Sequence, residues 1–199
     1  MKRKLSQLIF VFLCMIMMFP IGVSGDTGPK PSVTIKFKNM GDELCYGTLL
    51  SKEESTGPAW AWDGKEENIN LDFVDRDIWE AFVNYEDSDG FHFLQWAWNV
   101  SDTKELSWTY YPPNEFKVLL YYPETNTFVV SDIFKRYAFD TYYTVDMDGV
   151  DIDSIKYDES LSGNQRLDMH KSYEFKNEVK ALVCRILITV VVEVLIGLL

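Results

Sequence analysis

The stretch FKVLLYYPETNTFVV, residues 116–130, decides the fold class of this chain. Two β-rich runs, 116–122 and 127–130, flank a short loop of turn-forming residues, which is typical of a β-hairpin. Upstream, Val33, Ile35 and Phe37 alternate with polar residues in the period-two pattern of a half-buried strand. Further strands are predicted at 44–50, 91–98, 106–111 and 137–145. We therefore predict a mainly β fold, a sandwich of the immunoglobulin or fibronectin type III kind.

One short helix interrupts this β pattern. Asp75 is a suitable N-cap, and the apolar residues after it share one face of a helix: Ile78, Trp79, Phe82 and Val83. The same residues could also form a strand, so both interpretations stay open for this segment.

The first 25 residues have the composition of an export signal. Lys2, Arg3 and Lys4 form a basic start, an apolar run follows at 8–19, and small residues precede a polar segment. The apolar run is short for a membrane-spanning helix, which needs about 20 residues. We expect cleavage between Gly25 and Asp26 and place the β domain at 26–145. An uncleaved anchor is the alternative.

The C-terminal residues predict a membrane attachment. Residues 146–177 are acidic and poor in large apolar side chains, as in a solvated tether. Residues 178–199 are mostly apolar, and we predict a transmembrane helix there, the first of several in a longer protein. The alternative is an apolar helix with another role.

Small and polar residues recur at every fourth position of this helix. Such a row forms one ridge along a helix, and ionisable groups at bilayer depth usually face protein or water. We predict that the ridge packs against other transmembrane helices, from the same longer protein or an identical copy. Its members are Ala181, Arg185, Thr189, Glu193 and Gly197.

The charge and the cysteine count exclude several function classes. The formal net charge is −12, which argues against nucleic-acid binding, because that needs a basic surface. Three scattered cysteines do not make a disulfide framework. Two histidines serve zinc poorly, and the chain has no glycine-rich phosphate loop, so no cofactor is predicted.

A cluster of carboxylates after the last predicted strand invites a calcium interpretation. Its members are Asp146, Asp148, Asp151 and Asp153. With Gly149 at the sixth position of an EF-hand loop, Thr144 would be the first ligand and Ile155 the last, and neither can bind the cation as required. We favour a solvated acidic turn, and predict no metal site.

Tryptophan gives the best candidate for a binding surface. All six tryptophans lie between residues 60 and 108. Trp96 and Trp98 lie on one face of the predicted strand, as Trp60 and Trp62 would if extended. Aromatic faces stack on sugar rings or peptide side chains and are common at binding hot spots. The alternative is that these rings belong to the sandwich core.

Several segments are similar to a known group of proteins. They are NMGDELCY (39–46), WTYYPP (108–113), VLLYYP (118–123), RYAFD (136–140) and CRI (184–186). They resemble an uncharacterised family of predicted membrane proteins from Gram-positive gut bacteria of the clostridial type. The resemblance implies an export signal, an extracytoplasmic β domain and several transmembrane helices, with no activity attached.

Three functions follow as expectations. The first is a non-catalytic recognition or sensing module, anchored in the cell membrane, that binds a glycan or a peptide. The second is a cell-surface hydrolase of glycans or peptides that acts through carboxylates, which would need convergent groups in a pocket. The third is the accessory domain of a multi-span transporter or signalling protein.

Overall fold

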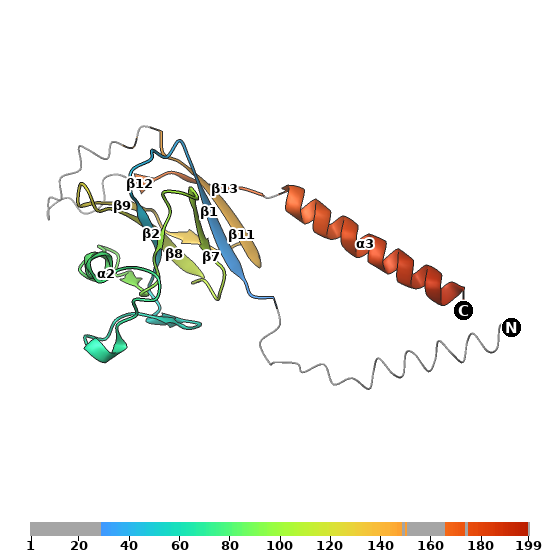
Figure 1. Cartoon of the computed structure of the whole chain (residues 1–199), viewed down its shortest axis with the longest axis horizontal. Coiled ribbons are helices and arrows are strands. Elements are labelled where there is room, and N and C mark those ends of the chain that lie inside the picture. The colour runs from blue at the N-terminus through green and yellow to red at the C-terminus, as the bar shows by residue number, and fades with distance from the viewer. Residues whose placement is uncertain (1–28, 149, 151–165, 174, 199) are drawn as a thin grey trace. The chain divides into compact units, whose positions relative to one another are not determined.

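Strand β1 (Ser32–Lys38) buries Val33, Ile35 and Phe37 on one face, as their alternation predicts. It belongs to a four-stranded sheet in the order β13-β11-β1-β7 (Figure 1). The computed structural model describes residues 29–148, 150, 166–173 and 175–198. The other strands of this sheet are β7 (Glu105–Trp108), β11 (Asp140–Asp146) and β13 (Met169–Lys171). The predicted export signal, residues 1–25, lies outside the described residues.

The second sheet contains the predicted hairpin. Strands β8 (Glu115–Tyr122) and β9 (Thr127–Ser131) pair antiparallel from Tyr122 opposite Thr127, which confirms that prediction. Strand β2 (Tyr46–Ser51) lies on the other side of β8. Short strands complete this sheet: β5 (His92–Phe93), β6 (Trp98–Asn99), β10 (Phe134–Lys135) and β12 (Arg166–Leu167).

The two sheets enclose the larger hydrophobic core. Ile35 from the first sheet and Leu49 and Val118 from the second are fully buried in the same cluster. Each large apolar side chain buried in this way contributes about 1.5–3 kcal/mol. The mainly β prediction is confirmed.

Helix α2 (Arg76–Val83) covers the outer face of the second sheet. Ile78, Trp79 and Phe82 are buried against Leu119 and Tyr121 of β8. The helix follows Asp75, whose backbone is extended as at an N-cap, although its side chain makes no capping hydrogen bond. The short helix predicted from the apolar face is therefore confirmed. Before it come a hairpin of β3 (Ser55–Thr56) and β4 (Ala59–Trp60), and the 3-10 turn η1 (Glu66–Asn68).

The strand pairing differs from the predicted immunoglobulin or fibronectin type III sandwich in two places. Such sandwiches consist of antiparallel sheets, whereas β1 pairs in parallel with β11, and β9 pairs in parallel with β12. The alternation of residues along one strand does not say in which direction its neighbour runs, so the sequence could not decide this.

Two predicted boundaries are corrected. The strand expected at 91–98 is divided into β5 and β6, because Gln95 adopts a left-handed backbone (φ +59°) that ends the strand. The tether expected at 146–177 contains β12 and β13, which pair with β9 and β11 and bury Leu167 and Met169. The β domain therefore extends over Lys30–Tyr173.

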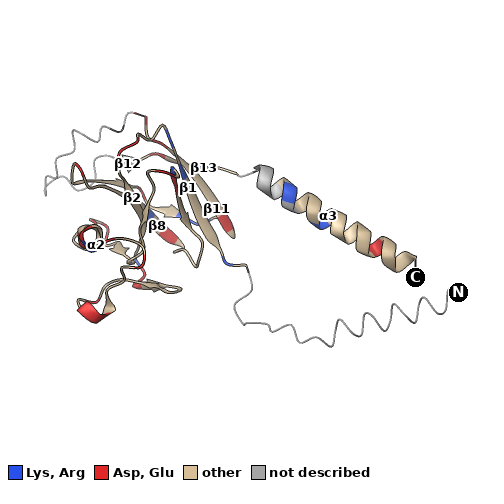
Figure 2. Cartoon of the chain, viewed as in Figure 1, with Lys and Arg blue, Asp and Glu red and all other residues tan. Residues whose placement is uncertain are grey.

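Helix α3 (Phe175–Gly197) lies outside the β domain, in the other of the two compact units of the chain. The transmembrane helix was expected in this segment. Its apolar side chains are exposed from Val179 to Leu198, apart from Ala181, whose side chain is not described. Within 179–197 the charged residues are Lys180, Arg185 and Glu193, and Figure 2 colours this part of the helix mostly tan. Among the described residues, we find no helix with both the length and the apolar character needed to cross a membrane.

Candidate functional site

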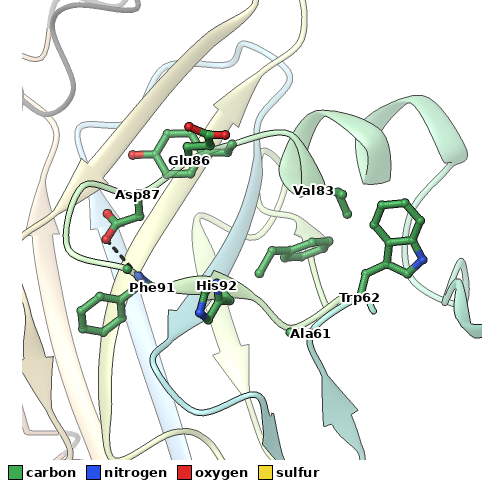
Figure 3. A pocket seen from close by; sticks show the side chains of 10 residues that line it. Ala61, Trp62, Val83, Glu86, Asp87, Phe91 and His92 are labelled. Carbon is green, nitrogen blue, oxygen red and sulfur yellow. Dashed lines mark hydrogen bonds between the residues drawn. The ribbon is translucent and has the colours of Figure 1, made fainter. Parts of the chain in front are cut away.

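A pocket of about 370 Å³ lies between the end of α2, the start of the loop that joins β4 to η1, and strand β5 (Figure 3). In this view Trp62 and Val83 lie on one side, Asp87 and Phe91 lie on the other, and His92 lies between them. The aromatic lining consists of Trp62, Tyr85, Phe91 and Phe93, and the polar lining consists of Glu86, Asp87 and His92.

Packing against α2 holds part of the aromatic lining in place. The indole N–H of Trp62 donates to the carbonyl of Lys65 at 3.0 Å, and its ring meets Trp79 of α2 edge to face, with 5.2 Å between centroids. Phe93 stacks on Phe82 of the same helix at 5.1 Å. Rings fixed on both sides lose little conformational entropy when a ligand contacts them.

Asp87 shapes the opposite wall rather than serving as a free acid. Its Oδ2 accepts the backbone N–H groups of Asp89 (3.0 Å) and Phe91 (3.2 Å), which closes the turn through Gly90, with φ +75°. Its Oδ1 accepts from Lys117 Nζ at 2.6 Å. A hydrolase with paired carboxylates would therefore need a partner for Glu86 from elsewhere.

Lys117 is buried near the start of β8 and forms ion pairs with two carboxylates of this turn. Its ammonium contacts both Asp87 and Asp89 at 2.6 Å. Burial opposes the charged ammonium, but the hydrogen bonds to the two carboxylates outweigh that cost and raise the pKa of Lys117 above its usual value. The ammonium also lies 5.3 Å from the centroid of Phe91, within the range of a cation–π contact.

Glu86 and His92 are exposed at the rim of the pocket. A carboxylate accepts hydrogen bonds, and an imidazole donates or accepts them according to its protonation. Together with the aromatic lining they suit a ligand that has an apolar face and hydroxyl or amine groups at its edge.

Gln95 connects the elements around the pocket. Its Oε1 accepts from Trp79 Nε1 (3.1 Å) and from the backbone N–H of Asn70 (3.0 Å). Its Nε2 donates to the carbonyls of Trp60 (3.3 Å) and Asn68 (3.2 Å). One buried amide thereby ties α2 to the irregular segment that carries Trp62.

The structure separates the four predicted tryptophans into three environments. Trp62 lines the pocket, whereas Trp60, two residues earlier, is 38% exposed on β4 and does not line it. Trp96 and Trp98 are half-buried and pack on Trp108 at 5.2 and 5.4 Å between centroids. They belong to the edge of the core rather than to the pocket.

The carboxylate cluster after β11 is only partly described. Asp146 Oδ1 accepts the backbone N–H of Asp148 (3.1 Å) and the amide of Asn39 (2.8 Å), and these hydrogen bonds lower the pKa of Asp146. Asp151 and Asp153 lie outside the described residues. Within the part that is described, no three metal-binding side chains come together.

Sequence reasoning missed Lys117, Gln95 and the rim residue Glu86. A signal for Lys117 was present, since it is the single charged residue inside the apolar run 116–122. A lone cation in a buried strand needs a carboxylate partner, and the pair Asp87 and Asp89 in a turn supplies one. Gln95 had no comparable signal, because its partners lie up to 35 residues away.

Compared with known protein families, with characterised proteins and with solved structures, the chain shows no significant match.

Proposed function

We propose that the β domain is a recognition module that binds a glycan or a peptide in the pocket beside α2. The observation that carries this proposal is the aromatic lining of the pocket, with Trp62 held against Trp79 and with Glu86 and His92 exposed at the rim. A pocket of about 370 Å³ accommodates one sugar ring or one large side chain, at the lower end of the usual range for ligand sites.

Glycans and peptides both carry groups that complement the residues lining the pocket. A pyranose ring has an apolar face that stacks on indole and hydroxyl groups that pair with a carboxylate or imidazole. A basic or aromatic peptide side chain makes the same contacts, with a cation opposite Glu86. Asp87 is not free to bind the ligand, because its carboxylate is buried and already paired with Lys117.

The neighbouring tryptophans provide the test. Trp62→Ala removes the pocket wall, whereas Trp60→Ala removes an indole of the same size that does not line the pocket. We expect wild type and Trp60→Ala to bind the same members of glycan and peptide arrays, and Trp62→Ala to lose at least tenfold in affinity. Glu86→Gln should weaken binding of cationic peptides more than binding of neutral glycans.

Three results would contradict the proposal. They are no binding to either array, equal binding by Trp62→Ala and wild type, or an equal loss in both tryptophan variants while circular dichroism shows them folded. Release of a shortened glycan or peptide from the array would instead support the hydrolase.

We also propose that the chain attaches this domain to a membrane. The exposed apolar side chains along α3 support the proposal. Arg185, Thr189 and Glu193 follow each other at four-residue intervals in α3, and Thr189 Oγ1 donates to the carbonyl of Arg185 at 3.0 Å. In a bilayer, such a row is best placed against other helices.

Cysteine crosslinking along α3 tests the helix packing. Cysteines at 185, 189 and 193 should crosslink to a neighbouring helix more strongly than cysteines at 187, 191 and 195. Crosslinks spread evenly around the helix would contradict the proposed ridge. Recovery of the full chain in the soluble fraction would contradict membrane attachment itself.

A further inference from the structure

Both ends of the β domain leave it at the same end of the four-stranded sheet. Ser32, near the start of β1, lies opposite Asp140 at the start of β11, and its backbone N–H donates to the carbonyl of Phe139 at 3.0 Å. The last residues of β13 reach the same end, where the backbone N–H of Ser172 donates to Tyr142 at 2.9 Å. Figure 1 shows β1, β11 and β13 side by side. The chain therefore enters and leaves the β domain at the same end of this sheet, with β11 between the entering and the leaving strand.

Exposed aromatic side chains gather at this end. Tyr173 is 68% exposed, Phe139 is 52% exposed and Tyr111 is 42% exposed. Tyr137 places its ring 6.0 Å from that of Tyr173, and its hydroxyl donates to the carbonyl of Ser172 at 2.9 Å. These contacts join the segments that carry Tyr137 and Tyr173, and the exposed rings lie on connecting segments just beyond the strands of the sheet.

Lysines accompany these rings. Lys171 Nζ lies 4.9 Å from the centroid of Tyr137, and Lys30 Nζ lies 5.4 Å from that of Tyr111. The nearest carboxylate along β11, Asp140, accepts from Ser32 Oγ at 2.7 Å. We call these residues the chain-end face: Lys30, Tyr111, Tyr137, Phe139, Lys171 and Tyr173. Lys30 and Lys171 place positive charge beside these rings, although the chain as a whole has a formal net charge of −12.

We propose that the chain-end face lies against the headgroup region of a lipid bilayer. Tyrosine and other amphipathic rings are enriched at membrane–water interfaces, and lysine side chains extend towards headgroups there. The inference rests on the proposed membrane attachment, because the apolar helix α3 follows Tyr173 closely in sequence. A bilayer is favoured over a second copy of this chain, since an acidic copy of equal charge would repel the domain.

Depth-dependent fluorescence quenching tests the orientation in the full-length chain. A background with Cys14→Ser and Cys184→Ser leaves only Cys45, which is buried. Into it we would introduce either Phe139→Cys on the face or Lys38→Cys at the opposite end of β1, each labelled with bimane. In phosphatidylcholine vesicles that contain lipids spin-labelled at the headgroup, the probe at 139 should be quenched at least twofold more than the probe at 38.

A charge variant tests the chemistry of the face. In vesicles with phosphatidylglycerol, Lys30→Glu together with Lys171→Glu should lower the quenching at 139 and leave it unchanged at 38. Equal quenching of the two probes in chains that float with the vesicles would overturn the chain-end face while leaving membrane attachment intact. Chains that do not float with vesicles would overturn the attachment and this inference together. Circular dichroism confirms that each variant is folded.

Discussion

The ammonium of Lys117 lies 2.6 Å from Oδ1 of Asp87, with 5% and 2% of the two side chains exposed. This ion pair links a residue near the start of β8 to the turn that forms one wall of the pocket. Removing charges from water costs several kcal/mol per ion, so such a pair is retained only with good geometry and further hydrogen bonds. Asp87 has both, since two backbone N–H groups also donate to it.

Breaking this pair from one side should be costly. We expect Lys117→Met to reduce the free energy of unfolding by about 3–5 kcal/mol, because it leaves the carboxylate of Asp87 buried without its cation. The double variant Lys117→Met with Asp87→Asn should lose less than the sum of the two single variants. Urea denaturation measures all three, and additive losses would show that the two side chains do not interact.

The same pair makes stability depend on alkaline pH. The folded state holds the Lys117 proton more tightly than the unfolded state, so the stabilisation is complete below the ordinary pKa of 10.5 and is lost as the pH rises through the folded value. Burial also raises the pKa of Tyr121 and Tyr143, which adds to the alkaline loss. The decrease above pH 10.5 should therefore be steeper in wild type than in Lys117→Met, as measured by urea denaturation at each pH. Parallel curves would contradict this assignment.

Two tryptophans with different hydrogen bonding make a matched pair. Trp79 Nε1 donates to Gln95, whereas the buried Nε1 of Trp96 has no partner among the described residues. Phenylalanine removes the indole N–H in both cases. We expect Trp79→Phe to cost about 1–2 kcal/mol more than Trp96→Phe, because only the former breaks a hydrogen bond and leaves an acceptor less satisfied. Thermal unfolding measures the difference, and a larger loss for Trp96→Phe would refute it.

Strand β12 offers a test of the domain boundary. Leu167 is 1% exposed, so Leu167→Ala should cost about 2–5 kcal/mol of unfolding free energy. Asp168→Ala, at the exposed neighbouring position, should stay within about 0.5 kcal/mol of wild type. If Leu167→Ala were as stable as wild type in chemical denaturation, residues 166–171 would be a tether after all.

Short-range sequence patterns were sufficient to predict three parts of the fold. The alternation of Val33, Ile35 and Phe37 predicted β1, the run 116–130 predicted the hairpin, and the apolar face around Phe82 predicted α2. Each of these signals is contained within a few residues, because the periodicity of a strand or helix reflects which face of that element is buried.

Long-range contacts decided what the sequence did not show. The parallel pairing of β1 with β11 joins residues more than 100 positions apart, and the place of β12 and β13 in the sheets depends on partners outside their own acidic segment. The pocket likewise combines Trp62 with the segment 83–93, while Gln95, between β5 and β6, and Lys117, in β8, hold its walls. Composition and spacing therefore determined β1, the β8–β9 hairpin and α2, and which tryptophans were candidates. Only the tertiary structure placed Trp62 at a pocket and Trp96 at the core, because burial depends on neighbours that the fold brings together.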